Sequence, residues 1–238
     1  KEILRYIASI NRNTIINTEL RAELLDQETV DLFGKAGVTF LEIGLQSTNP
    51  VTLKTIGRAT NFEKFENGIK LLEKIKMQYV IQLIIGLPGD DLGTFKNSMD
   101  YVLNLAPDKL QVFELQLLPG SALYDNAVEH GMLFTLAPPH LVIQNKTFSY
   151  SDIIKAKLLF KEAFLIYNVN FAMLANIIDL KPSEIIEKWA YWRESEIGLS
   201  LRDFEKMNSI RRLLLFSRFI KEFVLQDSYS VFKKIYIR

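Results

Sequence analysis

Four short stretches of the chain combine an apolar run with polar side chains that could contact a ligand. They span residues 19–22, 42–47, 82–89 and 114–120. Three of these stretches contribute a glutamate, namely Glu19, Glu42 and Glu114. Carboxylates at strand ends can serve as acid and base, or they can accept hydrogen bonds from a cationic group. Because Glu42 lies four residues before Gln46 at the end of its run, we expect it to face away from the mouth of the site, which weakens the acid–base interpretation.

Taken singly, each polar residue also has an ordinary structural explanation. Glu19 and Arg21 could form an ion pair at a strand end, and Gln46 could cap the backbone of a loop. Arg58 could be a solvated cation at the C-terminal end of a helix. The glycines of the later stretches could simply occupy turns.

The segments that position these residues predict an α/β fold with a parallel sheet. Up to about residue 136, helix-like segments alternate with short apolar runs, which is typical of βα units. The expected strands are 14–20, 39–45, 79–85 and 109–117, and the expected helices are 1–11, 26–35, 50–56, 61–76 and 93–105. Four such strands make half of an eight-stranded barrel or a smaller open sheet. The carboxyl ends of parallel strands meet at one edge, so the four polar stretches should converge there.

The pattern changes to helices after Pro138-Pro139. Apolar residues at helical spacing predict helices over 151–168, 183–196 and 201–226. We therefore expect two domains, a partial barrel over 1–137 and a helical domain over 138–238. Trp189, Tyr191 and Trp192 are expected either to form part of a core or to contact a planar substrate.

Composition excludes several classes of function. The 238 residues contain 29 basic and 28 acidic side chains, so the net charge of +1 offers no reason to expect nucleic acid as a partner. No apolar run is long enough to span a membrane, and we expect a cytoplasmic protein. There is no cysteine, which excludes disulfides and cysteine-ligated iron–sulfur clusters within these residues, and two histidines cannot build a multi-histidine metal site.

The order and spacing of the polar stretches together resemble a known family. Glu-x-Arg-Ala is followed by E-I-G-L-Q-S-x-N, a Leu-Lys-x-Ile-x-Arg helix, I-x-L-I-x-G-L-P-G and L-x-P-G-S-x-L-Y. Over residues 14–134 this series is similar to the later half of radical S-adenosylmethionine (SAM) enzymes. The branch with the greatest resemblance includes the oxygen-independent coproporphyrinogen oxidases and the cobalamin-binding radical SAM proteins.

The resemblance implies a role for each polar residue. Glu19 matches the carboxylate that contacts the amino-acid portion of SAM, and Arg58 matches the cation that faces the SAM carboxylate. Gln46, which follows Glu19 by 27 positions and precedes Arg58 by 12, matches the amide that binds the ribose hydroxyls. Gln82 stands where similar sequences carry an aspartate, so the chain departs from the family at a ribose or carboxylate contact.

The resemblance also implies an adenine side of the pocket. The strand that includes Ile84 and Gly86 matches the strand that packs beside the adenine, which requires apolar contact and backbone groups. Gln116 matches a position whose backbone lies near the adenine, which would leave its side chain free for substrate.

The cluster-binding Cys-x-x-x-Cys-x-x-Cys loop of this family has no counterpart here. The chain begins at Lys1 in a helix-like segment, so we expect a C-terminal fragment of a longer enzyme that is inactive alone. In the parent, SAM and a [4Fe–4S] cluster are expected as cofactors, with cobalamin as a further candidate, and an electron donor is expected as partner.

The resemblance implies a parent that is a methyltransferase or an oxidoreductase. It would be a cobalamin-binding radical SAM methyltransferase or a protein similar to the anaerobic Mg-protoporphyrin monomethyl ester cyclases, acting on a tetrapyrrole or another hydrophobic small molecule. The alternative is a cysteine-free barrel-like module that binds a nucleotide-like ligand or a partner protein without redox chemistry.

Overall fold

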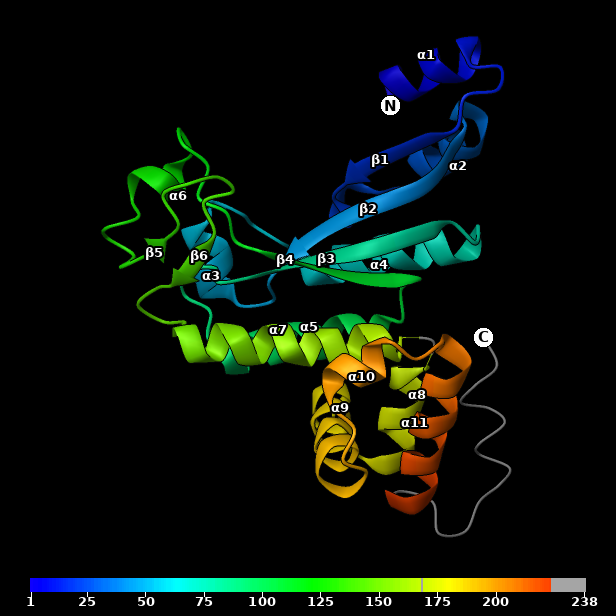
Figure 1. Ribbon diagram of the computed structural model, residues 1–238. Helices are drawn as coiled ribbons and strands as arrows, with labels where there is room; N and C mark the ends of the chain where they lie inside the picture. The colour runs from blue at the N-terminus through cyan, green and yellow to red at the C-terminus, as the bar shows by residue number, and fades with distance from the viewer. Residues whose placement is uncertain (168, 224–238) are drawn as a thin grey trace.

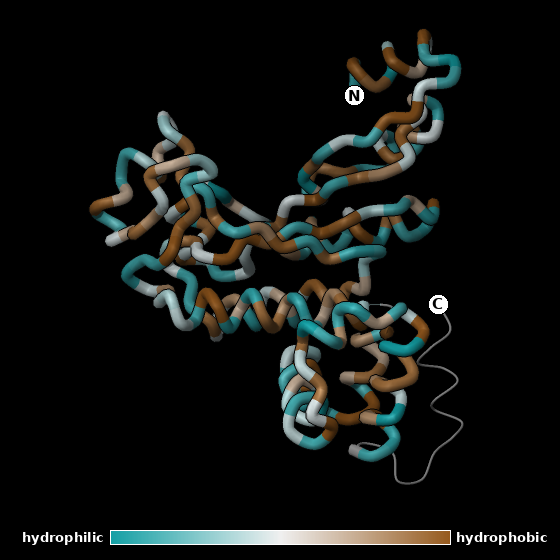
Figure 2. Tube along the Cα trace, in the orientation of Figure 1, coloured by the Kyte–Doolittle hydropathy of each residue, from teal (hydrophilic) through white to brown (hydrophobic). Residues whose placement is uncertain are grey.

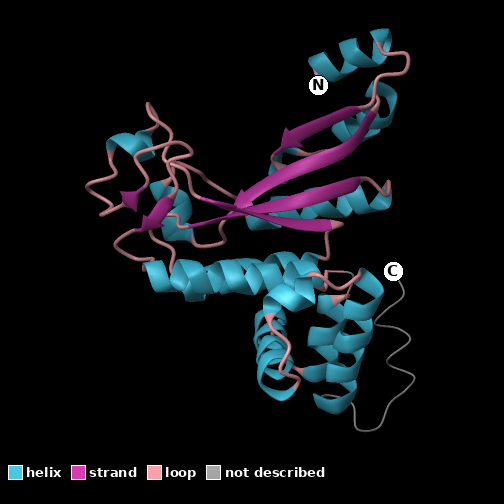
Figure 3. Ribbon diagram, in the orientation of Figure 1, coloured by secondary structure: helices cyan, strands magenta, loops and turns pink. Residues whose placement is uncertain are grey.

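The core of the protein is a four-stranded parallel sheet whose strands follow one another in chain order. The computed structural model describes residues 1–167 and 169–223. The strands are β1 (Ile16–Leu20), β2 (Val38–Gln46), β3 (Gln78–Ile85) and β4 (Lys109–Glu114), and each pairs in parallel with the next. Figures 1 and 3 show this sheet as an open, twisted surface. The predicted α/β fold with a parallel sheet is confirmed.

Helices between the strands cover one face of the sheet. They are α2 (Gln27–Ala36), α4 (Phe62–Lys74) and α5 (Leu92–Leu105), with α1 (Glu2–Ile10) against α2, whereas the short helix α3 (Pro50–Thr55) lies beyond the end of β2. Alternate residues of β2, namely Leu41, Ile43 and Leu45, are fully buried. They form one core with Phe65 of α4 and Phe95 of α5. This alternation is what a strand with one covered face requires.

Capping residues explain why these helices begin and end where the sequence predicts. Asp26 accepts a hydrogen bond from the backbone of Thr29 at the start of α2, and Gly37 ends that helix in the left-handed region at φ 82°. Asp91 and Thr94 form a reciprocal capping box at the start of α5.

The other face of the sheet carries a row of polar residues. Gly44 of β2, Gln82 of β3 and Gln111 of β4 are neighbours in register, and Glu19 of β1 is the neighbour of Glu42 on β2. Successive residues of a strand point to opposite faces, so this row is separated from the apolar core by the sheet itself. Glu42 therefore shares its face with Gly44 and Gln82.

Two short segments connect the sheet to the C-terminal helices. The helix α6 (Ala122–Asp125) precedes a small antiparallel hairpin of β5 (Leu133–Phe134) and β6 (Val142–Gln144). These elements have a small apolar core of their own that includes Leu87 and Leu117.

The described residues from Tyr150 to Phe223 are mainly helical, as predicted. The elements are α7 (Tyr150–Leu165), α8 (Phe171–Ile178), α9 (Pro182–Tyr191), a π-helix η2 (Trp192–Glu196), α10 (Leu201–Glu205) and α11 (Ser209–Phe223). Figure 2 shows these helices below the sheet, with apolar and polar segments alternating along them. The predicted ends of the helices at 168 and at 224–226 lie outside the described residues.

Two helical details differ from the prediction. The expected helix over 201–226 is interrupted, because Asn208 accepts a hydrogen bond from the backbone of Arg211 and so starts a new helix. The helix α8 was not predicted, since its sequence Phe-Ala-Met-Leu-Ala-Asn-Ile-Ile is almost wholly apolar and has little periodicity.

The aromatic residues of α9 and η2 belong mainly to the helical core. Trp189 is fully buried, and its ring lies 5.2 Å from that of Phe216 and 5.3 Å from that of Phe204 between centroids. Trp192 is also buried, whereas Tyr191 is 65% exposed. The core interpretation is therefore correct for the two tryptophans, and their rings are not available to a planar substrate.

Candidate functional site

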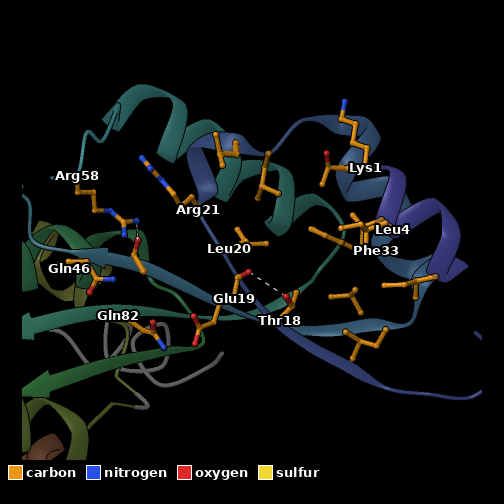
Figure 4. Close-up of a pocket in the computed structure, with 18 residues that line it drawn as sticks. Lys1, Leu4, Thr18, Glu19, Leu20, Arg21, Phe33, Gln46, Arg58 and Gln82 are labelled. Carbon is orange, nitrogen blue, oxygen red and sulfur yellow. Dashed lines mark hydrogen bonds between the residues drawn. The ribbon is translucent and has the colours of Figure 1, made fainter. Parts of the chain in front are cut away.

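A pocket of about 850 Å³ lies along β1 and reaches the carboxyl end of β2 and the middle of β3. Glu19 reaches it from β1, Gln46 from the end of β2 and Gln82 from β3, while Arg58 follows α3. Figure 4 shows these four side chains at one end of the pocket, with Leu4 and Phe33 at the other. Residues far apart in the sequence thus converge at the strand ends.

The backbone of β2 is shaped to bring Gln46 and Arg58 together. The register between β2 and β3 shifts between Gly44 and Gln46, and Gln46 has a left-handed φ of 74°. A Cβ atom at position 44 would lie 2.5 Å from Nε2 of Gln46 and 3.7 Å from a guanidinium nitrogen of Arg58. Only glycine leaves room for this arrangement at position 44.

The Arg58 side chain has unused capacity to bind an anion. It is half-buried, it donates to the carbonyl oxygen of Gly44, and its Nε is buried with no hydrogen-bond partner. Burial, together with the nearby positive charge of Arg21, lowers the pKa of the guanidinium. A ligand carboxylate against the part of the guanidinium that lines the pocket would balance its charge.

Arg21 does not form the ion pair with Glu19 that the sequence allowed. The chain turns into a short 3-10 helix, η1 (Ala22–Leu24), directly after β1, and this turn brings Glu23 back to Arg21 at 2.6 Å. Arg21 also donates to the backbone carbonyl of Ala59, next to Arg58. This leaves the Glu19 carboxylate exposed on the pocket.

Gln82 has two partners on the polar face of the sheet. Its Nε2 lies 2.7 Å from a carboxylate oxygen of Glu42 and 3.2 Å from Oε1 of Gln111. Glu42 and Gln111 do not line the pocket themselves but a separate cavity of about 430 Å³ beside it. Sequence reasoning missed this hydrogen-bonded row, because it depends on the strand register.

The three other residues singled out from the sequence lie outside the pocket that holds these four. Ile84 is partly buried against the small core near Leu87, and Gln116 is exposed beside Leu141. Gly86 has a φ of 93°, and its carbonyl oxygen accepts a hydrogen bond from Asn145 at 2.8 Å.

The three glutamates considered for acid–base chemistry do not share one site. Glu19 lines the pocket, whereas Glu42 is bound to Gln82. Glu114 forms a salt bridge of 2.8 Å with Lys157 of α7. The arrangement does not support an acid and base acting together on one substrate.

Asp90 supports the site in a way that the sequence did not indicate. Of the adjacent residues Asp90 and Asp91, it is Asp91 that caps α5. Asp90 is buried and accepts hydrogen bonds from Ser47 at 3.1 Å and Thr52 at 2.8 Å, and its burial raises its pKa. It joins the loop after β3 to the loop after β2, next to Gln46.

The residues present do not fit an iron–sulfur cluster. The sequence contains no cysteine, and residues 1–167 and 169–223 include no group of three side chains suited to a metal ion. By contrast, the pocket offers a hydrogen-bond acceptor at Glu19, amides at Gln46 and Gln82 and a cation at Arg58, and these groups fit SAM.

Among the helices that the structure describes, none has the length and apolar character needed to cross a membrane.

Fold and pocket together define an α/β protein that offers a polar small-molecule site at the carboxyl ends of parallel strands. Comparison with known families makes this more specific. Residues 1–102 match the Radical SAM superfamily, the family that the order and spacing of the polar stretches resemble. All four of the pocket residues from the sequence prediction lie within the matched segment.

Individual relatives share part of their length with this chain. Uncharacterized protein MJ1620 of Methanocaldococcus jannaschii is 28% identical over 114 residues, which are 47% of this chain and 22% of that protein. The heme chaperone HemW of Buchnera aphidicola is 23% identical over 120 residues, covering 50% of this chain and 32% of the relative. The chain therefore spans a fifth to a third of the length of these relatives.

One similar solved structure is the radical SAM methyltransferase TsrM from Kitasatospora setae, with cobalamin and a [4Fe-4S] cluster bound. It has a TM-score of 0.49 and 18% identity, and covers 64% of this chain and 33% of the other.

Proposed function

We propose that this chain contributes the ribose, adenine and amino-acid side of the SAM pocket of a radical SAM enzyme. The observation that carries the proposal is that Glu19, Gln46, Arg58 and Gln82 line one cavity at the carboxyl ends of the strands. These residues lie in the segment that matches the superfamily.

Each side chain has a role that its charge and contacts support. Glu19 would accept hydrogen bonds from the ammonium group of SAM, and the guanidinium of Arg58, which lines the pocket, would bind the carboxylate. Gln46 and Gln82 would bind the ribose hydroxyls. When bound, SAM supplies the sulfonium on which the chemistry of the superfamily depends; the four residues hold and orient it.

The adenine side of the site is proposed to lie beyond the pocket of about 850 Å³, at Ile84, Gly86 and the backbone of Gln116. Ile84 offers apolar surface and Gly86 allows close approach of the backbone, as a flat aromatic ligand requires. The proposed partial barrel covers residues 1–137, and the helices of residues 138–238 form the second domain.

The iron–sulfur cluster would be bound by residues that are not among these 238. The whole enzyme is then a methyltransferase or an oxidoreductase of the cyclase type, with a cytoplasmic location, an external electron donor and cobalamin as a candidate second cofactor. The name of the HemW relative, a heme chaperone, supports a tetrapyrrole or another hydrophobic small molecule as substrate. The chain alone would bind SAM weakly and would not cleave it.

Titration calorimetry with SAM tests the site. The chain, or the longer protein that contains it, is compared with its Glu19→Ala and Gln46→Ala variants, and Glu73→Ala on the exposed surface of α4 serves as the control. We expect both site variants to weaken binding about tenfold, the effect of one lost hydrogen bond of about 1.4 kcal/mol. Unchanged affinity in both would refute the assignment of the site.

A module that binds a nucleotide-like ligand or a partner without redox chemistry is the second candidate, favoured by the absence of cysteine from the sequence. The gene upstream of Lys1 distinguishes the two. A Cys-x-x-x-Cys-x-x-Cys motif in the same reading frame supports the radical SAM enzyme. A stop codon or an unrelated linker directly before Lys1 supports the module.

A further inference from the structure

The side chain of Gln82 is held by two neighbours on the polar face of the sheet. Both of the contacts that the structure gives for its amide involve the nitrogen atom, at 2.7 Å from Glu42 and 3.2 Å from Gln111. An amide nitrogen carries two hydrogens, so these two contacts use its full capacity as a donor.

The chemistry of Glu42 fixes which way the amide points. An ionised carboxylate only accepts hydrogen bonds, so it requires the nitrogen end of the amide and repels the oxygen end. Gln111 could turn its own amide to suit either end, but beside Glu42 it presents its oxygen to the same nitrogen. The remaining polar atom of Gln82, Oε1, is left for the pocket that this residue lines.

Neither of the two neighbours lines that pocket. Glu42 and Gln111 border the cavity of about 430 Å³ on the same face of the sheet, together with Phe160 and Phe164 of α7. Their hydrogen bonds to the Gln82 amide connect them to the larger pocket. Figure 4 shows Gln82 beside Glu19 at the polar end of the pocket.

We propose that Glu42 and Gln111 are positioning residues that hold the Gln82 amide with Oε1 toward the pocket, so that position 82 acts as an acceptor for a ribose hydroxyl. The inference rests on the proposed SAM site and deepens it. A glutamine can present either its oxygen or its nitrogen to a ligand. It therefore serves as a dedicated acceptor only if its orientation is fixed.

The first experiment observes the amide without a ligand. Glutamine is labelled with ¹⁵N in the whole chain, and the side-chain NH₂ signals of Gln82 are assigned by their loss in Gln82→Ala. We expect slow hydrogen exchange of these protons in the wild type and at least tenfold faster exchange in Glu42→Gln, where both amides can turn. Equal exchange rates in the two proteins would overturn the proposed orientation.

The second experiment tests by ligand affinity whether position 82 accepts a hydrogen bond from a ribose hydroxyl. Adenosine and 2′,3′-dideoxyadenosine, which lacks the 2′ and 3′ hydroxyls, are titrated into the chain. The wild type should bind adenosine about tenfold more tightly, and Glu42→Gln should reduce this ratio severalfold.

An exchange variant separates positioning from general damage. In the double variant Glu42→Gln/Gln82→Glu, the amide at position 42 donates to a carboxylate at position 82, which again presents an acceptor to the pocket. We expect the preference for adenosine to return to the wild-type ratio. A ratio that stays low in the exchange variant, or one that Glu42→Gln leaves unchanged, would contradict the proposal.

These experiments distinguish failure of the proposed SAM site from failure of the positioning role of Glu42 and Gln111. If the wild type binds neither nucleoside, the ribose assignment and the SAM site are both overturned. The exchange rates of the Gln82 amide still decide, independently, whether Glu42 fixes its orientation.

Discussion

Replacing Gly68 by alanine should destabilise the protein, because α4 packs there directly against the backbone that follows β1. A Cβ atom at position 68 would lie 2.1 Å from the carbonyl oxygen of Ala22 and 2.8 Å from its carbonyl carbon. Backbone atoms cannot turn aside as the end of a side chain can, so α4 or η1 must move. Ala22 lies beside Arg21, and the movement would reach the pocket.

The expected magnitude follows from two opposing effects. Overpacking of a buried contact costs about 1–3 kcal/mol, and this contact with backbone belongs at the upper end. Alanine has a higher helix propensity than glycine, which raises the free energy of unfolding by about 1 kcal/mol. We therefore expect Gly68→Ala to lose about 2 kcal/mol of unfolding free energy, which corresponds to a fall of about 4–8 °C in melting temperature for a chain of this size.

Gly34→Ala is the matched control, because Gly34 also lies within a helix, α2, but a Cβ atom there would meet nothing within 4 Å. This variant should gain about 1 kcal/mol. Thermal unfolding followed by circular dichroism compares the two variants with the wild type. If Gly68→Ala melts at or above the temperature of Gly34→Ala, the close packing of α4 on Ala22 is refuted.

Three further variants test other parts of the structure. Gly44→Ala should displace the flexible amide of Gln46, which would lie 2.5 Å from the new Cβ atom, and weaken SAM binding about tenfold in calorimetry while the melting temperature changes little. Burial raises the pKa of Asp100, so the folded chain holds this proton more tightly than the unfolded chain, and stability falls as pH rises from 3.8 through the raised pKa. Urea unfolding across that range should therefore show a loss in the wild type relative to Asp100→Asn; parallel pH profiles would contradict it. Arg193→Met should lower the free energy of unfolding by about 3–5 kcal/mol, because it leaves the buried carboxylate of Glu162 without its ion-pair partner, which in the wild type lies 2.5 Å away. The double variant with Glu162→Gln should recover part of this loss, and a double variant no more stable than the single one would argue against the pair.

The order of strands and helices could be predicted because local chemistry specifies it. Asp26 and Gly37 mark the two ends of α2, and buried residues alternate along β2 as one covered face requires. Helix α8 lacks such periodicity, and the break before Ser209 depends on the capping contact of Asn208.

The polar residues of the site could be found from their spacing, but their partners could not. Arg21 meets Glu23 because of the 3-10 turn after β1, so Glu19 is left to the pocket. Gln82 meets Glu42 because of the register between neighbouring strands. Both contacts arise from tertiary geometry that a single sequence does not display.

The central claim is that these side chains hold SAM, and Arg58→Ala tests it most directly when SAM and adenosine are titrated in parallel. Arg58 is assigned to the carboxylate, which adenosine lacks. We predict that Arg58→Ala weakens SAM binding about tenfold or more, in line with about 1.5–3 kcal/mol for a hydrogen bond to a charged group, and leaves adenosine affinity unchanged. Equal affinity of SAM for the wild type and Arg58→Ala would contradict it.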